Sequence, residues 1–250
     1  MSIELEPFFQ PIIDVNSGLI AYNEALARRK STTKGHYVSA GAIFSSDAFT
    51  KKQIIEFDTQ VRHKALTKYK NYTGNAKLTI NISPDWFNND IQESNKKIPT
   101  LSMIEECGID PSKIVIELTE YNGDKHLIEH FVRAYRNMGV KIAIDDFGSG
   151  FSQIDRLIEI EPDIIKLDMN IFRRSLVSSY TKDLIDVISS FAKKRGTELI
   201  FEGIETTEQY KIAVDSGADF VQGYLFSQAQ PEFYPDDHFL NDVNTLKYSK

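Results

Sequence analysis

Seven short apolar runs in this chain end at polar side chains that could bind a metal ion. These side chains are Glu24, Asn81, Glu117, Asp145 with Asp146, Lys166, Glu202 and Gln222. Carboxylate and amide oxygens suit Mg²⁺ or Mn²⁺ better than zinc. Clustered carboxylates also raise one another's pKa unless protons or cations compensate them. The pattern therefore predicts a site for divalent cations, and Asp145 is able to bridge two adjacent ions.

A simpler interpretation treats each acidic residue as a helix N-cap or as part of a solvated loop. That interpretation suits one strand end taken alone. Over seven successive strand ends, neutral capping residues such as Ser and Thr should then have appeared among them. We therefore favour a shared site.

Two kinds of segment alternate along the chain and must position these residues. Apolar runs rich in Ile, Val and Phe, typical of buried strands, occupy 8–15, 19–26, 78–82, 114–118, 141–144, 164–167, 199–201 and 220–226. Helical periodicity occupies 49–70, 124–138, 181–194 and 207–216, and the last segment begins with Thr206 and Gln209 placed as a capping box.

This alternation predicts an α/β fold, a (β/α)8 TIM-like barrel in which the carboxyl ends of the strands meet on one face. The first two runs are an exception, because the three residues 16–18 between them are too few for a crossover helix. We therefore expect an antiparallel first strand.

Composition limits the function classes. The chain has no linker or low-complexity tract, so we expect a single domain over residues 1–250. The net charge of −7 disfavours a nucleic acid polymer or an anionic membrane as partner. One cysteine fits a reducing compartment, and no run approaches the ~18 apolar residues of a membrane span. We expect a cytoplasmic protein without a membrane segment.

The polar strand ends lie within eight motifs that resemble, in order, those of the EAL-domain family. They are Gln10-Pro11-Ile12, Glu24-Ala25-Leu26-Ala27-Arg28, Asn81-Ile82-Ser83, Glu117-Leu118-Thr119-Glu120, Asp145-Asp146-Phe147-Gly148-Ser149-Gly150, Lys166-Leu167-Asp168, Glu202-Gly203-Ile204-Glu205 and Gln222-Gly223-Tyr224. The resemblance implies a phosphodiesterase that hydrolyses the second messenger cyclic di-GMP to linear pGpG.

The resemblance also implies roles for individual residues. The first metal ion would be held by Glu24, Asn81, Glu117 and Asp145, and the second by Asp145, Asp146 and Glu202. Glu202 is alternatively a general base in this family. Lys166 would orient and polarise the attacking water, and Glu205 and Gln222 would support the site from beside the ions. The ligand would be contacted by Gln10, Leu26, Arg28 and Gln222. Two Mg²⁺ or Mn²⁺ ions are expected as cofactors, and Ca²⁺ is expected to inhibit.

A loop is implied to couple the site to a homodimer. It includes Phe147, Gly148, Ser149 and Gly150, and Glu120 would anchor it. Arg29, Ala229 and the segment 35–49 depart from the family pattern. These departures bear on ligand affinity rather than on the chemistry.

Two alternatives remain open at this stage. A non-hydrolysing effector could bind cyclic di-GMP and signal to a protein partner. Such members typically lack metal ligands or loop residues, and all of those are present here. Arg28, taken without its motif, would be interpreted as part of a surface ion pair.

Overall fold

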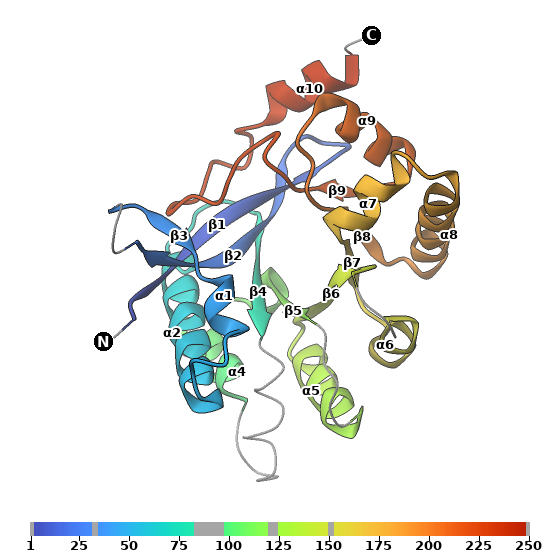
Figure 1. The fold of residues 1–250 in the computed structure, drawn as a ribbon. Coiled ribbons are helices and arrows are strands. Elements are labelled where there is room, and N and C mark those ends of the chain that lie inside the picture. The colour runs from blue at the N-terminus through green and yellow to red at the C-terminus, as the bar shows by residue number, and fades with distance from the viewer. Residues whose placement is uncertain (1–2, 32–34, 83–97, 120–124, 150–152, 249–250) are drawn as a thin grey trace.

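The computed structural model describes residues 3–31, 35–82, 98–119, 125–149 and 153–248. Its centre is a closed barrel, around which the helices are arranged (Figure 1). The barrel strands are β1 (Leu5–Asp14), β2 (Ile20–Lys30), β4 (Lys77–Ile82), β5 (Ile114–Leu118), β6 (Lys141–Phe147), β7 (Ile164–Leu167), β8 (Glu198–Phe201) and β9 (Phe220–Val221). The expected (β/α)8 TIM-like barrel is confirmed.

Strand β1 runs antiparallel to both of its neighbours, β2 and β9, while the other barrel pairings are parallel. The turn after β1 is stabilised by Asp14, whose Oδ1 accepts hydrogen bonds from the backbone N–H groups of Asn16 at 2.7 Å and Ser17 at 2.9 Å. In the resulting register Gln10 lies opposite Glu24. The antiparallel first strand is therefore confirmed.

Strand β9 is shorter than the run 220–226 suggests. Beyond Val221 the backbone turns toward the loop that follows β8, where Gln222 accepts a hydrogen bond from the N–H of Ile204 at 3.0 Å. A Cβ at Gly223 would lie 2.0 Å from the carbonyl oxygen of Ile204. This close approach of two backbones requires glycine, and it ends the strand.

Four helices match the periodic segments: α2 (Lys51–Tyr69), α5 (Lys125–Asn137), α8 (Ser179–Arg195) and α9 (Thr207–Asp215). The capping box of Thr206 and Gln209 is present. The remaining elements are short: β3 (Tyr37–Ser39), α1 (Gly41–Phe44), α4 (Pro99–Cys107), the 3₁₀ turn η1 (Pro111–Lys113), α6 (Gln153–Ile160), α7 (Met169–Ser175) and α10 (Leu240–Tyr248). Within the described ranges, no helix combines the length and apolar character needed to cross a membrane.

The barrel interior contains an apolar layer below the site. One residue from each of six strands forms it: Ile12, Tyr22, Val115, Ala143, Ile164 and Ile200. At the amino end of the barrel, the Tyr22 hydroxyl donates to Glu198, which also accepts a 2.8 Å hydrogen bond from Lys141. This layer fills the barrel below the polar groups, and a cleft lined by described residues reaches them from the carboxyl end.

Candidate metal centre

Strand alternation places the polar residues inside the barrel. Because side chains alternate between the two faces of a strand, a residue two positions after an interior residue also points inward. Each position of the interior layer on β2, β5, β6, β7 and β8 is followed two residues later by a charged group. These groups are Glu24, Glu117, Asp145, Lys166 and Glu202. Hydrophobic packing at the base of the barrel therefore fixes the direction of the charged groups above it.

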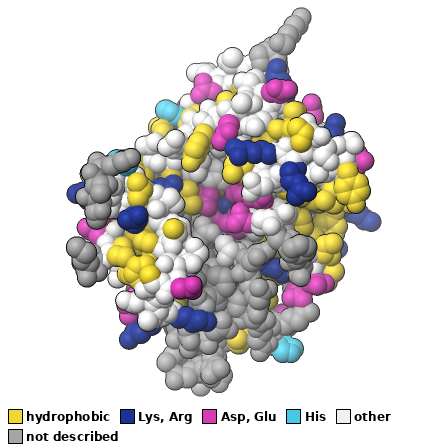
Figure 2. Space-filling model, viewed as in Figure 1, with side chains coloured by type: hydrophobic (Ala, Val, Ile, Leu, Met, Phe, Trp, Pro, Cys, Tyr) yellow, Lys and Arg dark blue, Asp and Glu magenta, His cyan; other side chains and the backbone are white. Residues whose placement is uncertain are grey.

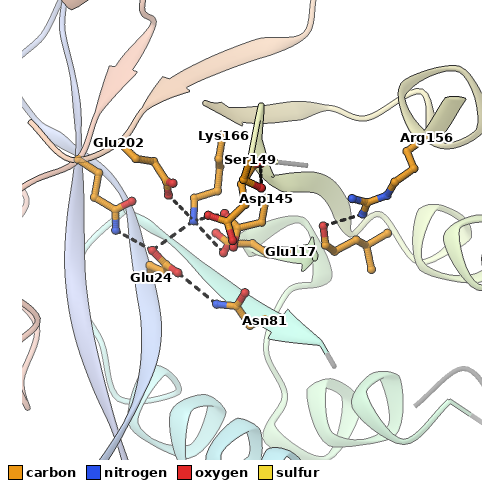
Figure 3. Close-up of polar contacts among 11 residues, drawn as sticks. Glu24, Asn81, Glu117, Asp145, Ser149, Arg156, Lys166 and Glu202 are labelled. Atoms are coloured by element: carbon orange, nitrogen blue, oxygen red, sulfur yellow. Dashed lines mark hydrogen bonds and ion pairs between the residues drawn. The ribbon is translucent and has the colours of Figure 1, made fainter. Parts of the chain in front are cut away.

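Lys166 lies at the centre of this group and is 1% exposed. Its Nζ atom contacts carboxylate oxygens from four different strands or strand ends (Figure 3). The distances are 3.3 Å to Glu24, 3.0 Å to Glu117, 2.9 Å to Asp145 and 2.9 Å to Glu202. One ammonium group thus holds together the carboxylates that metal ions would otherwise bridge.

Two amides orient Glu24. Gln222 Nε2 donates to Glu24 Oε2 at 2.7 Å, and Asn81 Nδ2 donates to Glu24 Oε1 at 3.1 Å. Both carboxylate oxygens are therefore fixed before any ligand arrives. Gln10 is also buried, but its Nε2 donates to the backbone oxygen of Ser227 at 3.1 Å.

The carboxylates form two groups with the geometry of metal sites. Glu24, Glu117 and Asp145 offer ligand oxygens within 4.8 Å of one another, and so do Asp145, Asp146 and Glu202. Asp145 belongs to both groups. Five carboxylates and one ammonium give a formal charge of −4, which two divalent cations would neutralise.

A buried oxygen in the first group is poorly satisfied. Glu117 is fully buried, and its Oε1 accepts no hydrogen bond of ordinary geometry from the part of the chain that the structure describes, although an interaction with the Thr79 side chain lowers the pKa of this carboxyl. A buried carboxylate oxygen without a donor is costly unless a cation binds it. Together with the all-oxygen donor set, this atom fits a hard divalent ion such as Mg²⁺ or Mn²⁺.

The surroundings of Lys166 and Glu24 keep both groups charged. Burial alone lowers the pKa of Lys166, but the surrounding carboxylates outweigh it and hold that pKa well above its ordinary value. Burial raises the pKa of Glu24, yet Lys166, Gln222 and Asn81 bring it below its ordinary value overall. In the metal-free protein Lys166 is therefore a cation and a hydrogen-bond donor rather than a general base.

The pKa values of Glu117 and Glu202 shift in the opposite direction. Burial, followed by the charge of Glu24, raises the pKa of Glu117 well above its ordinary range. Burial, opposed by Lys166 and assisted by Asp145, raises the pKa of Glu202 to about 8. In the absence of metal ions, these two groups favour bound protons.

Without divalent ions, the protein should lose stability as the pH rises from about 4.5 to about 8. Glu202 has a folded pKa of about 8 against an ordinary value of 4.5, so the folded state retains a proton that the unfolded chain has released. Its contribution to the free energy of unfolding is complete below the unfolded pKa and is lost as the pH passes the folded pKa. Urea unfolding in EDTA, repeated across this pH interval, measures how steeply the free energy of unfolding falls with pH. Glu202→Gln should flatten this dependence, and an unchanged slope in that variant would contradict the assignment.

The carboxyl end of β6 contains strained backbone. Asp146 has φ of 53°, in the left-handed region that non-glycine residues rarely adopt. Its carbonyl accepts a 2.8 Å hydrogen bond from the Ser149 hydroxyl, and Gly148 has φ of 104°. Phe147 is buried beneath this turn. Gly150 and Glu120 lie outside the described residues, so the predicted coupling of this loop to a dimer stays a prediction.

A cleft of about 480 Å³ opens above the carboxylates. Figure 2 shows Asp and Glu side chains gathered at the centre of the face viewed there. Besides the expected residues, including Gln10, Leu26 and Gln222, the cleft is lined by Asp168, Met169, Arg173 and Tyr224. Arg173 forms a 2.9 Å ion pair with Glu205, so Glu205 lies at the rim rather than among the buried carboxylates. Asp168 ends the motif Lys166-Leu167-Asp168 but has no role assigned from the sequence; its position directly after β7 is the signal that could have indicated one.

The other side of the site includes the segment that departs from the family pattern. A second cavity of about 480 Å³ is lined by Arg28, Asn81, Ser39 and Phe44, among others. Arg28 is half-buried and donates to the backbone oxygen of Ala27 at 3.1 Å. Strand β3, within 35–49, pairs with β2 along residues 28–30. The departing segment therefore forms part of the edge of the site.

Similar proteins share this barrel. Residues 2–229 match the EAL domain family. YkuI of Bacillus subtilis, an uncharacterized EAL-domain containing protein, is 27% identical over 233 residues, which cover 92% of this chain and 56% of YkuI. Its crystal structure in complex with the substrate c-di-GMP and calcium has a TM-score of 0.86, covering 98% of this chain and 60% of that one.

Two other proteins extend the comparison. The cyclic di-GMP phosphodiesterase RocR of Pseudomonas aeruginosa is 26% identical over 257 residues, covering 95% of this chain and 59% of RocR. A standalone EAL protein from Vibrio cholerae has the same fold, with a TM-score of 0.80 at 24% identity, covering 96% of this chain and 99% of that one. The chain thus spans little more than half of YkuI and RocR. With a family match over most of its length and the carboxylate barrel described above, the chain belongs to the EAL domain family.

Proposed function

We propose that the chain is a metal-dependent phosphodiesterase that hydrolyses cyclic di-GMP to pGpG. The observation that carries this proposal is the pair of carboxylate groups that share Asp145 at the carboxyl end of the barrel. The name of RocR and the cyclic di-GMP complex of YkuI support the choice of substrate.

In this proposal the first ion would be bound by Glu24, Asn81, Glu117 and Asp145, and the second by Asp145, Asp146 and Glu202. Two bound divalent ions would supply positive charge to the phosphodiester and lower the pKa of the attacking water. The oxygen of the water forms a bond to phosphorus as the bond between phosphorus and the 3′ oxygen breaks. One proton of the water is removed to a base or to solvent, and the leaving 3′ oxygen takes up a proton to become the 3′ hydroxyl of pGpG. Glu202, beside Lys166, is placed either to bind the second ion or to take the proton from the water.

The remaining roles follow from charge and position. Lys166 donates toward Asp145 and Glu202 and is therefore placed to orient water between them. Arg28 offers a planar set of donors suited to a phosphate oxygen. Gln222 and Asn81 keep Glu24 oriented while the ligand binds. Gln10 and Leu26 line the cleft where the nucleotide would lie.

Exchanging the metal ion should separate binding of cyclic di-GMP from its hydrolysis. With Mg²⁺ or Mn²⁺ the purified chain is expected to convert cyclic di-GMP to pGpG. With Ca²⁺ we expect binding of comparable affinity but little product, because Ca²⁺ prefers ~2.3–2.6 Å contacts and more ligands than Mg²⁺ at ~2.0–2.1 Å. Titration calorimetry and chromatography of the nucleotides measure both quantities.

Two outcomes would contradict this proposal. Fast turnover in Ca²⁺ would contradict the two-ion chemistry. Tight binding of cyclic di-GMP in Mg²⁺ and Mn²⁺ without product would favour a non-hydrolysing effector instead. A cytoplasmic homodimer formed by a single catalytic domain completes the proposal, and sedimentation of the protein with and without cyclic di-GMP tests its assembly.

A further inference from the structure

We infer that Arg156 is a positioning residue that holds the end of β5 so that Glu117 can bind metal. Arg156 lies on α6 and is 8% exposed. Its Nη2 atom donates to the backbone oxygens of Leu118 at 3.1 Å and Thr119 at 2.6 Å. Figure 3 shows its side chain directed at this strand end, apart from the carboxylates around Lys166.

The two carbonyls that Arg156 contacts immediately follow Glu117. Leu118 is the last residue of β5 and forms the last rung with both neighbouring strands, opposite Ile82 and Ile144. Thr119 lies beyond that ladder, and none of the described residues pairs with it as a strand neighbour. The guanidinium supplies charge-assisted hydrogen bonds at the point where the sheet stops supplying them. It therefore fixes the direction in which β5 leaves the barrel.

The same contact joins two parts of the metal site. Helix α6 begins at Gln153, soon after Asp145 and Asp146 on β6. Arg156 thus connects the segment that follows the shared ligand Asp145 to the strand that carries Glu117. Ligand distances in metal sites are set within about 0.2 Å, so a small shift of either segment would weaken binding. This inference rests on the proposed metal site, and it adds a residue that does not contact the ions.

A comparable arginine at the other end of α6 provides a matched control. Arg136 on α5 donates to the backbone oxygen of Ile160 at 3.0 Å, and it also donates to the carbonyl of Glu161. This contact fastens the carboxyl end of α6, near the amino end of the barrel. Arg136→Met removes the same type of interaction from the same helix, but away from the carboxylates.

The experiment compares Arg156→Met, Arg156→Lys and Arg136→Met with the wild type. The Mn²⁺ concentration that half-saturates the rise in melting temperature reports metal affinity without any turnover. We expect Arg156→Met to raise this concentration ~10–100-fold, as loss of an outer-sphere partner typically does, and to lower kcat in parallel. Arg156→Lys should recover part of the Mn²⁺ affinity and part of kcat. Arg136→Met should lower the melting temperature without changing the Mn²⁺ requirement by more than about twofold.

Equal Mn²⁺ requirements in Arg156→Met and wild type would overturn the inference, as would the same increase in Arg136→Met. If Arg156→Met does not fold, Arg156→Lys decides, because a Mn²⁺ requirement equal to that of the wild type would then exclude a positioning role. The result also separates this inference from the proposed function. Wild-type protein that binds Mn²⁺ but makes no pGpG would contradict hydrolysis, while a metal defect confined to the Arg156 variants would still support positioning.

Discussion

Asp145→Asn is expected to abolish hydrolysis of cyclic di-GMP and to weaken both metal sites together. Asp145 is the one carboxylate found in both described groups of metal-binding oxygens. Removing a partner outside the coordination sphere already costs ~10–100-fold in metal affinity or activity, so loss of the shared ligand should exceed that range. The amide retains the shape of the side chain and removes only its charge.

Calorimetric titration with Mn²⁺ and chromatography of pGpG test this prediction. Asp183→Asn, an exposed position on α8, provides the charge-matched control and should behave as wild type. In EDTA, Asp145→Asn should be at least as stable as the wild type, because one of the crowded negative charges is gone. Two intact Mn²⁺ sites in the variant would exclude Asp145 as the bridging ligand.

Lys166→Met is expected to destabilise the metal-free protein and to reduce turnover by about 10²–10³-fold, the range seen when one donor is removed from a catalytic site. The variant leaves four buried or partly buried carboxylates without the ammonium that contacts them. Breaking a buried ion pair from one side typically costs about 3–5 kcal/mol in the free energy of unfolding. Methionine fills nearly the same volume, so the loss comes from charge.

The diagnostic result is that Mn²⁺ restores the stability of Lys166→Met but not its turnover. Bound ions should compensate the carboxylates and recover the urea midpoint, while kcat stays low because the ammonium group that would orient the water is gone. Lys141→Met is the control, since Lys141 forms a 2.8 Å ion pair with Glu198 at the opposite end of the barrel. It should lower stability and leave kcat unchanged. Full recovery of kcat in Lys166→Met with Mn²⁺ would contradict the role of Lys166.

The sequence predicts the barrel and the convergence of its polar strand ends because both follow from short-range patterns. Apolar runs place Val115 and Ala143 in the interior, and two-residue alternation then places Glu117 and Asp145 above them. The turn at 16–18 is too short for anything but a hairpin. These features depend on residues that are neighbours along the chain.

Features that depend on distant backbone could not be predicted in the same way. The early end of β9 comes from the contact of Gly223 with Ile204, and the placement of Glu205 comes from Arg173 on α7. Arg156 is indistinguishable in the sequence from any helical arginine, since its partners are two carbonyl groups. Carbonyl groups are present at every residue, so no residue type marks the site of such a contact.

The reversed direction of β1 has a practical consequence for protein engineering. Leu5 pairs with Arg29, so the chain enters the barrel at the end where the carboxylate-lined cleft opens. By contrast, α10 packs against the hairpin turn, where a Cβ at Gly18 would lie 3.2 Å from Val243, and Figure 1 shows the two termini far apart. A fluorescent protein fused upstream of Leu5 would therefore report on, or obstruct, entry of the proposed nucleotide ligand. The same fusion after α10 would leave the cleft accessible.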